Sequence, residues 1–156
     1  MTDAGAVNTL VVGYGNSLRS DDGVGRHAAA RLADDPRLRG ATVLSQHQLT
    51  PELAVDVSTA SLVILVDAST DEMPGVITVR RVDPASAAGS TWSHHLEPAG
   101  LVALAIELWG AAPAVFEVGV GAASLELGDR LSPTVERALP CVVDAVAAIV
   151  AEHAPR

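Results

Sequence analysis

The stretch Leu62-Val63-Ile64-Leu65-Val66 is the most continuous apolar run of the chain, and it stops at a single carboxylate, Asp67. An unbroken run of this kind is typical of a central strand that is covered on both faces. A lone Asp can simply be a solvated residue that opens a turn. At the end of a buried central strand, however, the charge requires an explanation, and a functional site is one.

Shorter apolar segments alternate with helical patterns on both sides of this run. They predict four further strands and four helices, the strands at 9–12, 41–44, 76–82 and 115–120, the helices beginning near Val24, Pro51, Pro98 and Pro133. Only the residues 68–75 separate the central strand from strand 76–82, too few for a parallel crossover, so that strand is predicted to be antiparallel. The pattern predicts an α/β fold: a three-layer sandwich with a mostly parallel, twisted five-stranded sheet, one antiparallel strand and helices on both faces.

The composition limits the class of protein. The chain has 156 residues, of which 49% are hydrophobic, so we expect one packed domain over 1–156. Each candidate membrane span is interrupted by a charge, and no membrane span is expected. With ten Arg, no Lys and a net charge of -9, the chain has no basic face for nucleic acid phosphates. The single Cys141 and the absence of a secretory signal pattern favour the cytoplasm.

The loop after the first strand holds the richest motif, Gly-Tyr-Gly-Asn-Ser-Leu-Arg-Ser-Asp-Asp-Gly-Val-Gly at 13–25. Its beginning resembles a dinucleotide-binding turn, but Leu18 stands where the third glycine is needed. The second strand also ends in Ser45, where a ribose-binding acid is expected. The Asp21-Asp22 pair alone has an ordinary interpretation, since carboxylates ahead of a helix stabilise its positive N-terminal end.

Three polar groups converge once the predicted sheet is assembled. The loop with Asp21-Asp22, the end of the strand at Asp67 and the Ser93-His94-His95 segment before the helix at Pro98 can share one edge of the sheet. Two carboxylates and an imidazole form an incomplete oxygen and nitrogen ligand set with open positions, which suits a divalent first-row metal. A bound cation would also relieve the repulsion between the two acids.

Four segments, in this order and spacing, resemble the hydrogenase maturation endopeptidases: GYGNSLRSDDGVG, VILVDAS, SHHLEP and GDRLSPTVE. The similarity runs from about Leu10 to Val150. It implies a five-stranded sheet between helix layers and metal-contacting positions at Asp22, Asp67 and one histidine of the SHH step. The leucine and helix that follow favour His94 over His95. Family members often carry Glu at the first position, where this chain has the shorter Asp22.

The resemblance implies a function as well. Members of the family remove the C-terminal extension of a nickel-iron hydrogenase large-subunit precursor once nickel is inserted, and the substrate carries that nickel. Asp22, Asp67 and His94 are the expected catalytic and metal-contacting residues, and other divalent metals can fill the site in vitro. We expect substrate-binding residues nearby, at Asn16, Gln46, His47, Thr50 and His95.

Other functions fit parts of the pattern. Ser17 or Ser93 with His94 and Asp67 would form a serine hydrolase, but the chain lacks the GxSxG turn. Cys141 lies in the apolar last helix and is expected to be a small buried side chain. Asp22 and Asp67 sharing a proton would make a metal-independent aspartic-type peptidase. A non-catalytic, metal-dependent chaperone or adaptor of a hydrogenase subunit is the alternative that is not an enzyme.

Overall fold

A five-stranded sheet of order β2-β1-β3-β5-β4 forms the middle layer of the computed structural model, which describes residues 7–87 and 96–155. Strands β1, β2, β3 and β5 run parallel, and β4 runs antiparallel to β5. The fold class predicted from the sequence is therefore confirmed. The strand bounds are β1 Thr9–Tyr14, β2 Thr42–Gln46, β3 Leu62–Ser69, β4 Ile77–Arg81 and β5 Ala114–Gly121.

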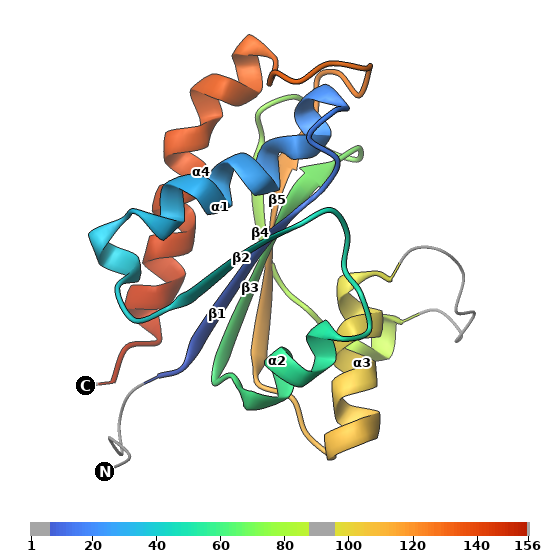
Figure 1. Ribbon diagram of the computed structural model, residues 1–156, viewed down its shortest axis with the longest axis vertical. Coiled ribbons are helices and arrows are strands. Elements are labelled where there is room, and N and C mark those ends of the chain that lie inside the picture. The colour runs from blue at the N-terminus through green and yellow to red at the C-terminus, as the bar shows by residue number, and fades with distance from the viewer. Residues whose placement is uncertain (1–6, 88–95, 156) are drawn as a thin grey trace.

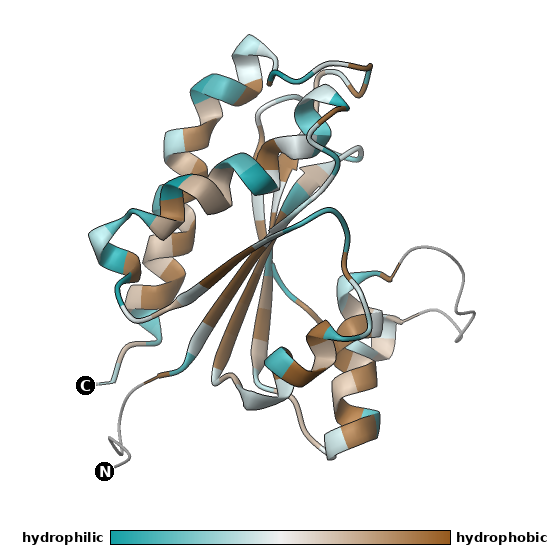
Figure 2. Ribbon diagram, viewed as in Figure 1, coloured by the Kyte–Doolittle hydropathy of each residue, from teal (hydrophilic) through white to brown (hydrophobic). Residues whose placement is uncertain are grey.

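Two pairs of helices cover the two faces of this sheet. Helices α1 (Val24–Ala33) and α4 (Pro133–Glu152) lie on one face, and α2 (Leu53–Thr59) and α3 (Pro98–Trp109) lie on the other (Figure 1). The central part of the sheet is mostly brown in Figure 2, because its strands are rich in hydrophobic residues. The sheet therefore has a hydrophobic core on each side, as the central-strand pattern predicts.

Strand alternation divides the central strand between the two cores. Ile64 and Val66 belong to the core under α1 and α4, whereas Val63 and Leu65 belong to the core under α2 and α3. All four side chains are fully buried. Because side chains alternate along a strand, the next residue on the α2/α3 face after Leu65 is Asp67.

Local sequence signals account for the helix ends. The Ser132 side chain accepts a hydrogen bond from the Val135 N–H and caps α4, with Pro133 in the first helical position. Helix α3 ends at Gly110, whose φ of 82° is the left-handed conformation that favours glycine. Gly25 allows α1 to lie directly on the sheet, since a Cβ there would collide with the carbonyl oxygens of Val66 and Tyr14.

Some sequence-based bounds were wrong. Strand β3 continues past Asp67 to Ser69, because β5 pairs with it as far as Gly121. Helix α2 begins at Leu53, and Thr50 belongs to the turn before it, where its carbonyl oxygen accepts from the Leu53 N–H at 3.1 Å. Cys141 is exposed, not buried, because the inward face of α4 is formed by Leu139, Val142, Val143 and Val146.

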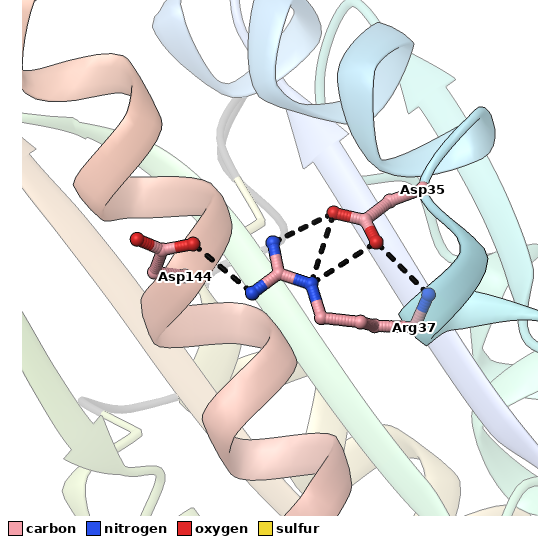
Figure 3. A network of polar contacts seen from close by, with 3 residues as sticks. All are labelled: Asp35, Arg37 and Asp144. Atoms are coloured by element: carbon pink, nitrogen blue, oxygen red, sulfur yellow. Dashed lines mark hydrogen bonds and ion pairs between the residues drawn. The ribbon is translucent and has the colours of Figure 1, made fainter.

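An ion-pair network joins the segment after α1 to α4 on the outside of the molecule (Figure 3). The Arg37 guanidinium contacts Asp35 at 2.8 Å and Asp144 at 3.0 Å. The Arg37 and Asp144 side chains are more than half exposed, so solvent screens the pair and its contribution to stability is small.

None of the helices in 7–87 and 96–155 is long and apolar enough to cross a membrane.

Candidate functional site

A cleft of about 800 Å³ opens at the carboxyl ends of the parallel strands. The chain passes from β1 outward to β2 and returns to β3 on the other side of β1, so β1 and β3 meet at a topological switch point, where α/β sheets usually bind ligands. In Figure 1, α2 and α3 lie toward the opposite end of the strands on this face. The polar side chains that line it include Tyr14, Asn16, Asp22, His47, Asp67 and Glu117.

The floor of the cleft is formed by side chains that follow the apolar residues of three strands. Tyr14 lies two residues beyond Val12, Asp67 two beyond Leu65 and Glu117 two beyond Val115, all on the α2/α3 face. Because Leu65 pairs with Glu117 across β3 and β5, Asp67 and Glu117 are diagonal neighbours. Neighbouring strands thus bring two acids and a phenol together.

Asp67 has an incomplete set of hydrogen-bond partners. Its Oδ2 accepts from the Tyr14 hydroxyl at 2.9 Å, while its buried Oδ1 has no partner among the described residues. Burial, followed by the negative charge of Glu117, raises the pKa of the Asp67 carboxyl, and the Tyr14 hydrogen bond offsets part of that rise. Asp22 is close enough for its charge to add to the increase. A cation or a proton at Oδ1 would therefore stabilise this site.

Asp22 reaches the same cleft from the loop after β1. Its Oδ2 accepts from the Asn16 N–H at 2.8 Å, which fixes the carboxylate within the loop. Gly15 makes this approach possible, because its φ of 142° favours glycine and a Cβ there would collide with the Asp22 carbonyl oxygen. The glycine-rich motif therefore shapes the loop around a carboxylate rather than around a dinucleotide.

Asp21, the neighbour of Asp22, has a different role. Its side chain is fully buried and accepts hydrogen bonds from the N–H groups of Ala123, Ser124 and Ser132 and from the Ser132 hydroxyl, at 2.7–3.0 Å. Burial opposes its ionisation, but these hydrogen bonds outweigh burial and lower the pKa of the carboxyl. Asp21 therefore joins the Asp22 loop to the segment that precedes α4.

Further contacts hold the two segments together. Ser20 has a φ of 52°, an uncommon conformation for a residue other than glycine. Its N–H donates to the Gly128 carbonyl at 2.9 Å, and its hydroxyl donates to the Glu126 carbonyl at 2.7 Å. The backbone that carries Asp22 is thus fixed by a loop more than a hundred residues later in the sequence.

The predicted substrate-binding residues fall into three groups. Asn16 and His47 line the cleft, and Leu49 next to them is buried under it. Gln46 and Thr50 do not line it, and the Gln46 carbonyl oxygen instead accepts from the Gly15 N–H at 3.1 Å. His95 lies outside the described residues, as does His94, the predicted imidazole ligand.

The predicted ligand set is described only in part. Asp22 and Asp67 share the cleft, and the residues 96–99 that follow the His94-His95 step also line it. Across 7–87 and 96–155, no three His, Cys, Asp or Glu side chains are grouped closely enough to hold a metal ion. A third ligand for a metal held by the two acids would have to come from outside these ranges or from a substrate.

The serine and cysteine candidates lie elsewhere. Ser17 does not line the cleft, and its hydroxyl accepts a long hydrogen bond of 3.5 Å from Arg26. Ser93 lies outside the described residues. Cys141 is exposed on α4, the helix on the other face of the sheet. Neither Ser17 nor Cys141 therefore has a place in the cleft.

Sequence reasoning missed two site residues, Tyr14 and Glu117, and it missed the structural role of Asp21. Strand alternation could have placed Tyr14 and Glu117 on the same face as Asp67, because each lies two residues beyond an apolar residue of its strand. No local signal could have found the partners of Asp21, since its donors lie at 123–132 and are brought to it only by the fold.

Comparisons with protein-family models and with curated protein sequences find no match. The fold and the site themselves define the class, an α/β protein with an acid-lined cleft at the switch point of its sheet. A comparison with solved structures does find matches. The hydrogenase maturating endopeptidase HybD from E. coli superposes with a TM-score of 0.76 and 27% identity, covering 96% of this chain and 98% of that one.

Two archaeal structures also match this chain over nearly its whole length. The hydrogenase 2 maturation peptidase of a Thaumarchaeota archaeon has a TM-score of 0.70 and 25% identity over 92% of this chain and 98% of its own. The [NiFe] hydrogenase maturation protease HycI of Thermococcus kodakarensis, at 20% identity and a TM-score of 0.74 over 95% of each chain, shares the fold. Over nearly its whole length this chain is similar to structures named hydrogenase maturation endopeptidases, and the similarity supports that family and a peptidase activity.

Proposed function

We propose that the peptidase removes the C-terminal extension of the precursor of a nickel-iron hydrogenase large subunit after nickel insertion, in the cytoplasm. The observation that carries this proposal is the pair Asp22 and Asp67 in one cleft, with the buried Oδ1 of Asp67 lacking a partner among the described residues. The names of the matching structures support a role in hydrogenase maturation.

We further propose that the nickel belongs to the substrate and that Asp22, Asp67 and His94 complete its coordination. Two carboxylates and one imidazole leave positions for ligands that the precursor supplies. When bound, the ion would polarise the scissile carbonyl or position the peptide bond, a contribution of several kcal/mol at most. Tyr14 orients Asp67 through the 2.9 Å hydrogen bond, and the Asn16 N–H orients Asp22.

One observation favours a second function, that of a metal-independent aspartic-type peptidase. The raised pKa of Asp67 favours a proton held by the pair Asp22 and Asp67, which line one cleft. Such a pair can activate water and protonate a leaving group without a metal. The two functions differ in whether the precursor must contain nickel.

The deciding experiment mixes the protein with nickel-loaded and with nickel-free precursor and weighs the products by mass spectrometry. We expect cleavage of the nickel-loaded precursor only. Equal cleavage of both precursors would instead support the aspartic-type mechanism. Stable binding of nickel-loaded precursor without any product would contradict both and would indicate the adaptor.

The two histidines provide a matched pair of variants. His94→Ala is expected to abolish processing of nickel-loaded precursor, since it removes the proposed imidazole ligand, while His95→Ala is expected to weaken substrate binding only. Mobility of the precursor on a gel after nickel loading measures both. Unchanged processing by His94→Ala would remove that residue from the proposed ligand set.

A further inference from the structure

Strand β4 forms one edge of the sheet and borders the cleft. It pairs with β5 on one side, with Ile77 opposite Val120 and Arg81 opposite Phe116. Two of its residues, Arg80 and Arg81, line the cleft itself, as does Val82, which follows the strand. An edge strand beside a peptidase cleft is a surface on which an extended peptide can add a strand.

The hydrogen-bond pattern identifies the groups that face outward. The Gly121 N–H donates to the Val76 carbonyl at 2.9 Å, and the Val82 N–H donates to the Val115 carbonyl at 2.8 Å. In an antiparallel pair the residues that bond to the partner strand alternate with residues that point away. The N–H and C=O groups of Ile77, Val79 and Arg81 therefore point away from β5, and within the described ranges they have no hydrogen-bond partner.

A second hollow extends the cleft along this edge. It measures about 430 Å³, and it shares Arg81, Val82 and Asp83 with the cleft. Its other lining residues are mostly apolar and come from α3, β5 and the segment before β5: Val102, Ile106, Ala112, Pro113 and Val115, together with Pro84. A peptide that leaves the acidic cleft along β4 therefore reaches an apolar surface next.

The side chains on β4 add a charge that suits such a peptide. Arg80 and Arg81 are exposed, and neither forms an ion pair with another described residue. Arg80 lies opposite Glu117 on the α2/α3 face that carries the cleft, and Arg81 lies opposite Phe116 on the other face, so each arginine places a positive charge on one face of β4. They would attract a carboxylate of the peptide and repel basic segments. Val79, between these charges and the start of the strand, is 49% exposed.

We propose that an extended segment of the precursor, next to the scissile bond, adds to β4 as a sixth strand. Its main chain would pair with Ile77, Val79 and Arg81, an apolar side chain would enter the hollow beside Ile106, and a carboxylate on the cleft side would face Arg80. This inference rests on the proposed function and adds the way in which the substrate is held. Because main-chain pairing does not depend on side-chain identity, specificity would come from the hollow and from Arg80.

A proline variant tests the pairing. Val79→Pro removes one outward N–H and keeps the bonds between β4 and β5, since proline is tolerated on an edge strand where its nitrogen faces solvent. We expect KM for nickel-loaded precursor to rise about tenfold with kcat unchanged, because the lost pairing contributes binding and not chemistry. Circular dichroism checks the fold of the variant. A wild-type KM in folded Val79→Pro would overturn the pairing.

A peptide series gives a second test on the unmodified protein. The probes are synthetic peptides that copy the C-terminal extension of the large subunit from the same organism, each with one N-methylated residue, and fluorescence anisotropy measures their binding. Strand addition predicts that affinity falls about tenfold at every second position only, because alternate N–H groups face β4. The matched control for each peptide is the one methylated a residue later.

The outcomes separate the two proposals. An even loss along the peptide, or none, would refute strand addition while leaving cleavage of the precursor intact. Failure of the wild-type protein to cleave nickel-loaded precursor counts against the proposed function instead. If Val79→Pro does not fold, the alternation in the peptide series alone decides for or against pairing at β4.

Discussion

Asp21 and Asp67 are both aspartates at the carboxyl edge of the sheet, yet their surroundings differ in almost every respect. Asp21 is fully buried and is surrounded by donors from Ala123, Ser124 and Ser132. Among the described residues Asp67 has one donor, Tyr14, and it faces a second acid, Glu117. The pKa of the Asp21 carboxyl is lowered as a result, and that of Asp67 is raised.

The difference shows how the fold separates structural from functional acids. A buried carboxylate that accepts several hydrogen bonds stabilises the loops that supply the donors. A buried carboxylate next to another acid, with an oxygen that lacks a partner among the described residues, destabilises the fold and gains from a ligand. At one edge of the sheet, Asp21 has the first arrangement and Asp67 the second.

The largest expected effect is on activity, in Asp67→Asn. We expect the rate of precursor processing to fall by about 10³-fold, equivalent to about 4 kcal/mol in the activation free energy. The reason is that the variant removes the carboxylate charge proposed to contact the substrate-bound ion. The melting temperature should not fall, since the variant also removes the repulsion from Glu117. Mass spectrometry of products and calorimetry measure the two quantities.

The control for that variant is Asp56→Asn. Asp56 is exposed on α2 and does not line the cleft, so its variant should process precursor at the wild-type rate. Wild-type processing by Asp67→Asn would show that Asp67 has no part in the reaction. A large loss of stability in Asp67→Asn would place it with the structural acids and remove the contrast with Asp21.

The next effect is on stability, in Asp21→Ala. It leaves the donors of Ser132, Ala123 and Ser124 without their acceptor, and we expect the free energy of unfolding to fall by about 3 kcal/mol. Urea denaturation measures this change. Activity measured well below the melting temperature should fall less than in Asp67→Asn, because Asp21 acts only through the position of Asp22. Unchanged stability would mean that the loops hold together without Asp21.

Local sequence patterns predicted the main elements of the fold correctly, but their ends less accurately. The apolar run 62–66 and the three- and four-residue periodicity of α4 gave correct elements, because local patterns determine which face is buried. Strand and helix ends were less accurate, since pairing with β5 extends β3 beyond its apolar run. The prediction of a buried Cys141 was wrong because an apolar neighbourhood in sequence does not fix which face a residue occupies.

For the candidate site, the sequence identified the two acids but not the residues that surround them. Asp67 could be singled out because a charge ends a buried run, and Asp22 was assigned through the family resemblance. The partners that give these acids their character could not be predicted, because they depend on strand order and register. Glu117 neighbours Asp67 only because β5 lies beside β3, and the donors to Asp21 come from a segment more than a hundred residues away.

A smaller effect is expected in the dependence of stability on pH. The Asp67 pKa rises from 3.8 to about 8 on folding. Between these pH values the folded protein keeps the Asp67 proton and the unfolded chain loses it, so the free energy of unfolding falls as the pH rises from about 4 toward 8. The Asp21 pKa falls below 3.8, so its contribution is present above pH 4 and is lost in more acidic solution.

Variants at the two positions should therefore move the pH curve at opposite ends. Relative to wild type, metal-free Asp67→Asn gains melting temperature between pH 4 and pH 8, whereas the deficit of Asp21→Asn shrinks below pH 4. Thermal melts across this range measure both. Parallel curves for the two variants would mean that the acids have similar surroundings in solution.

The smallest expected effect tests the Tyr14 hydroxyl, the donor that Asp67 has within 7–87 and 96–155. Tyr14→Phe removes the hydroxyl that donates to Asp67 Oδ2 at 2.9 Å, at a cost of about 1 kcal/mol. That hydrogen bond lowers the Asp67 pKa, so its loss should raise the pKa further and move the acid limb of the pH profile of kcat/KM to higher pH. Activity on the alkaline side of that limb should recover toward wild type. A uniform loss of kcat/KM with an unshifted limb would show that Tyr14 contacts substrate rather than positioning Asp67.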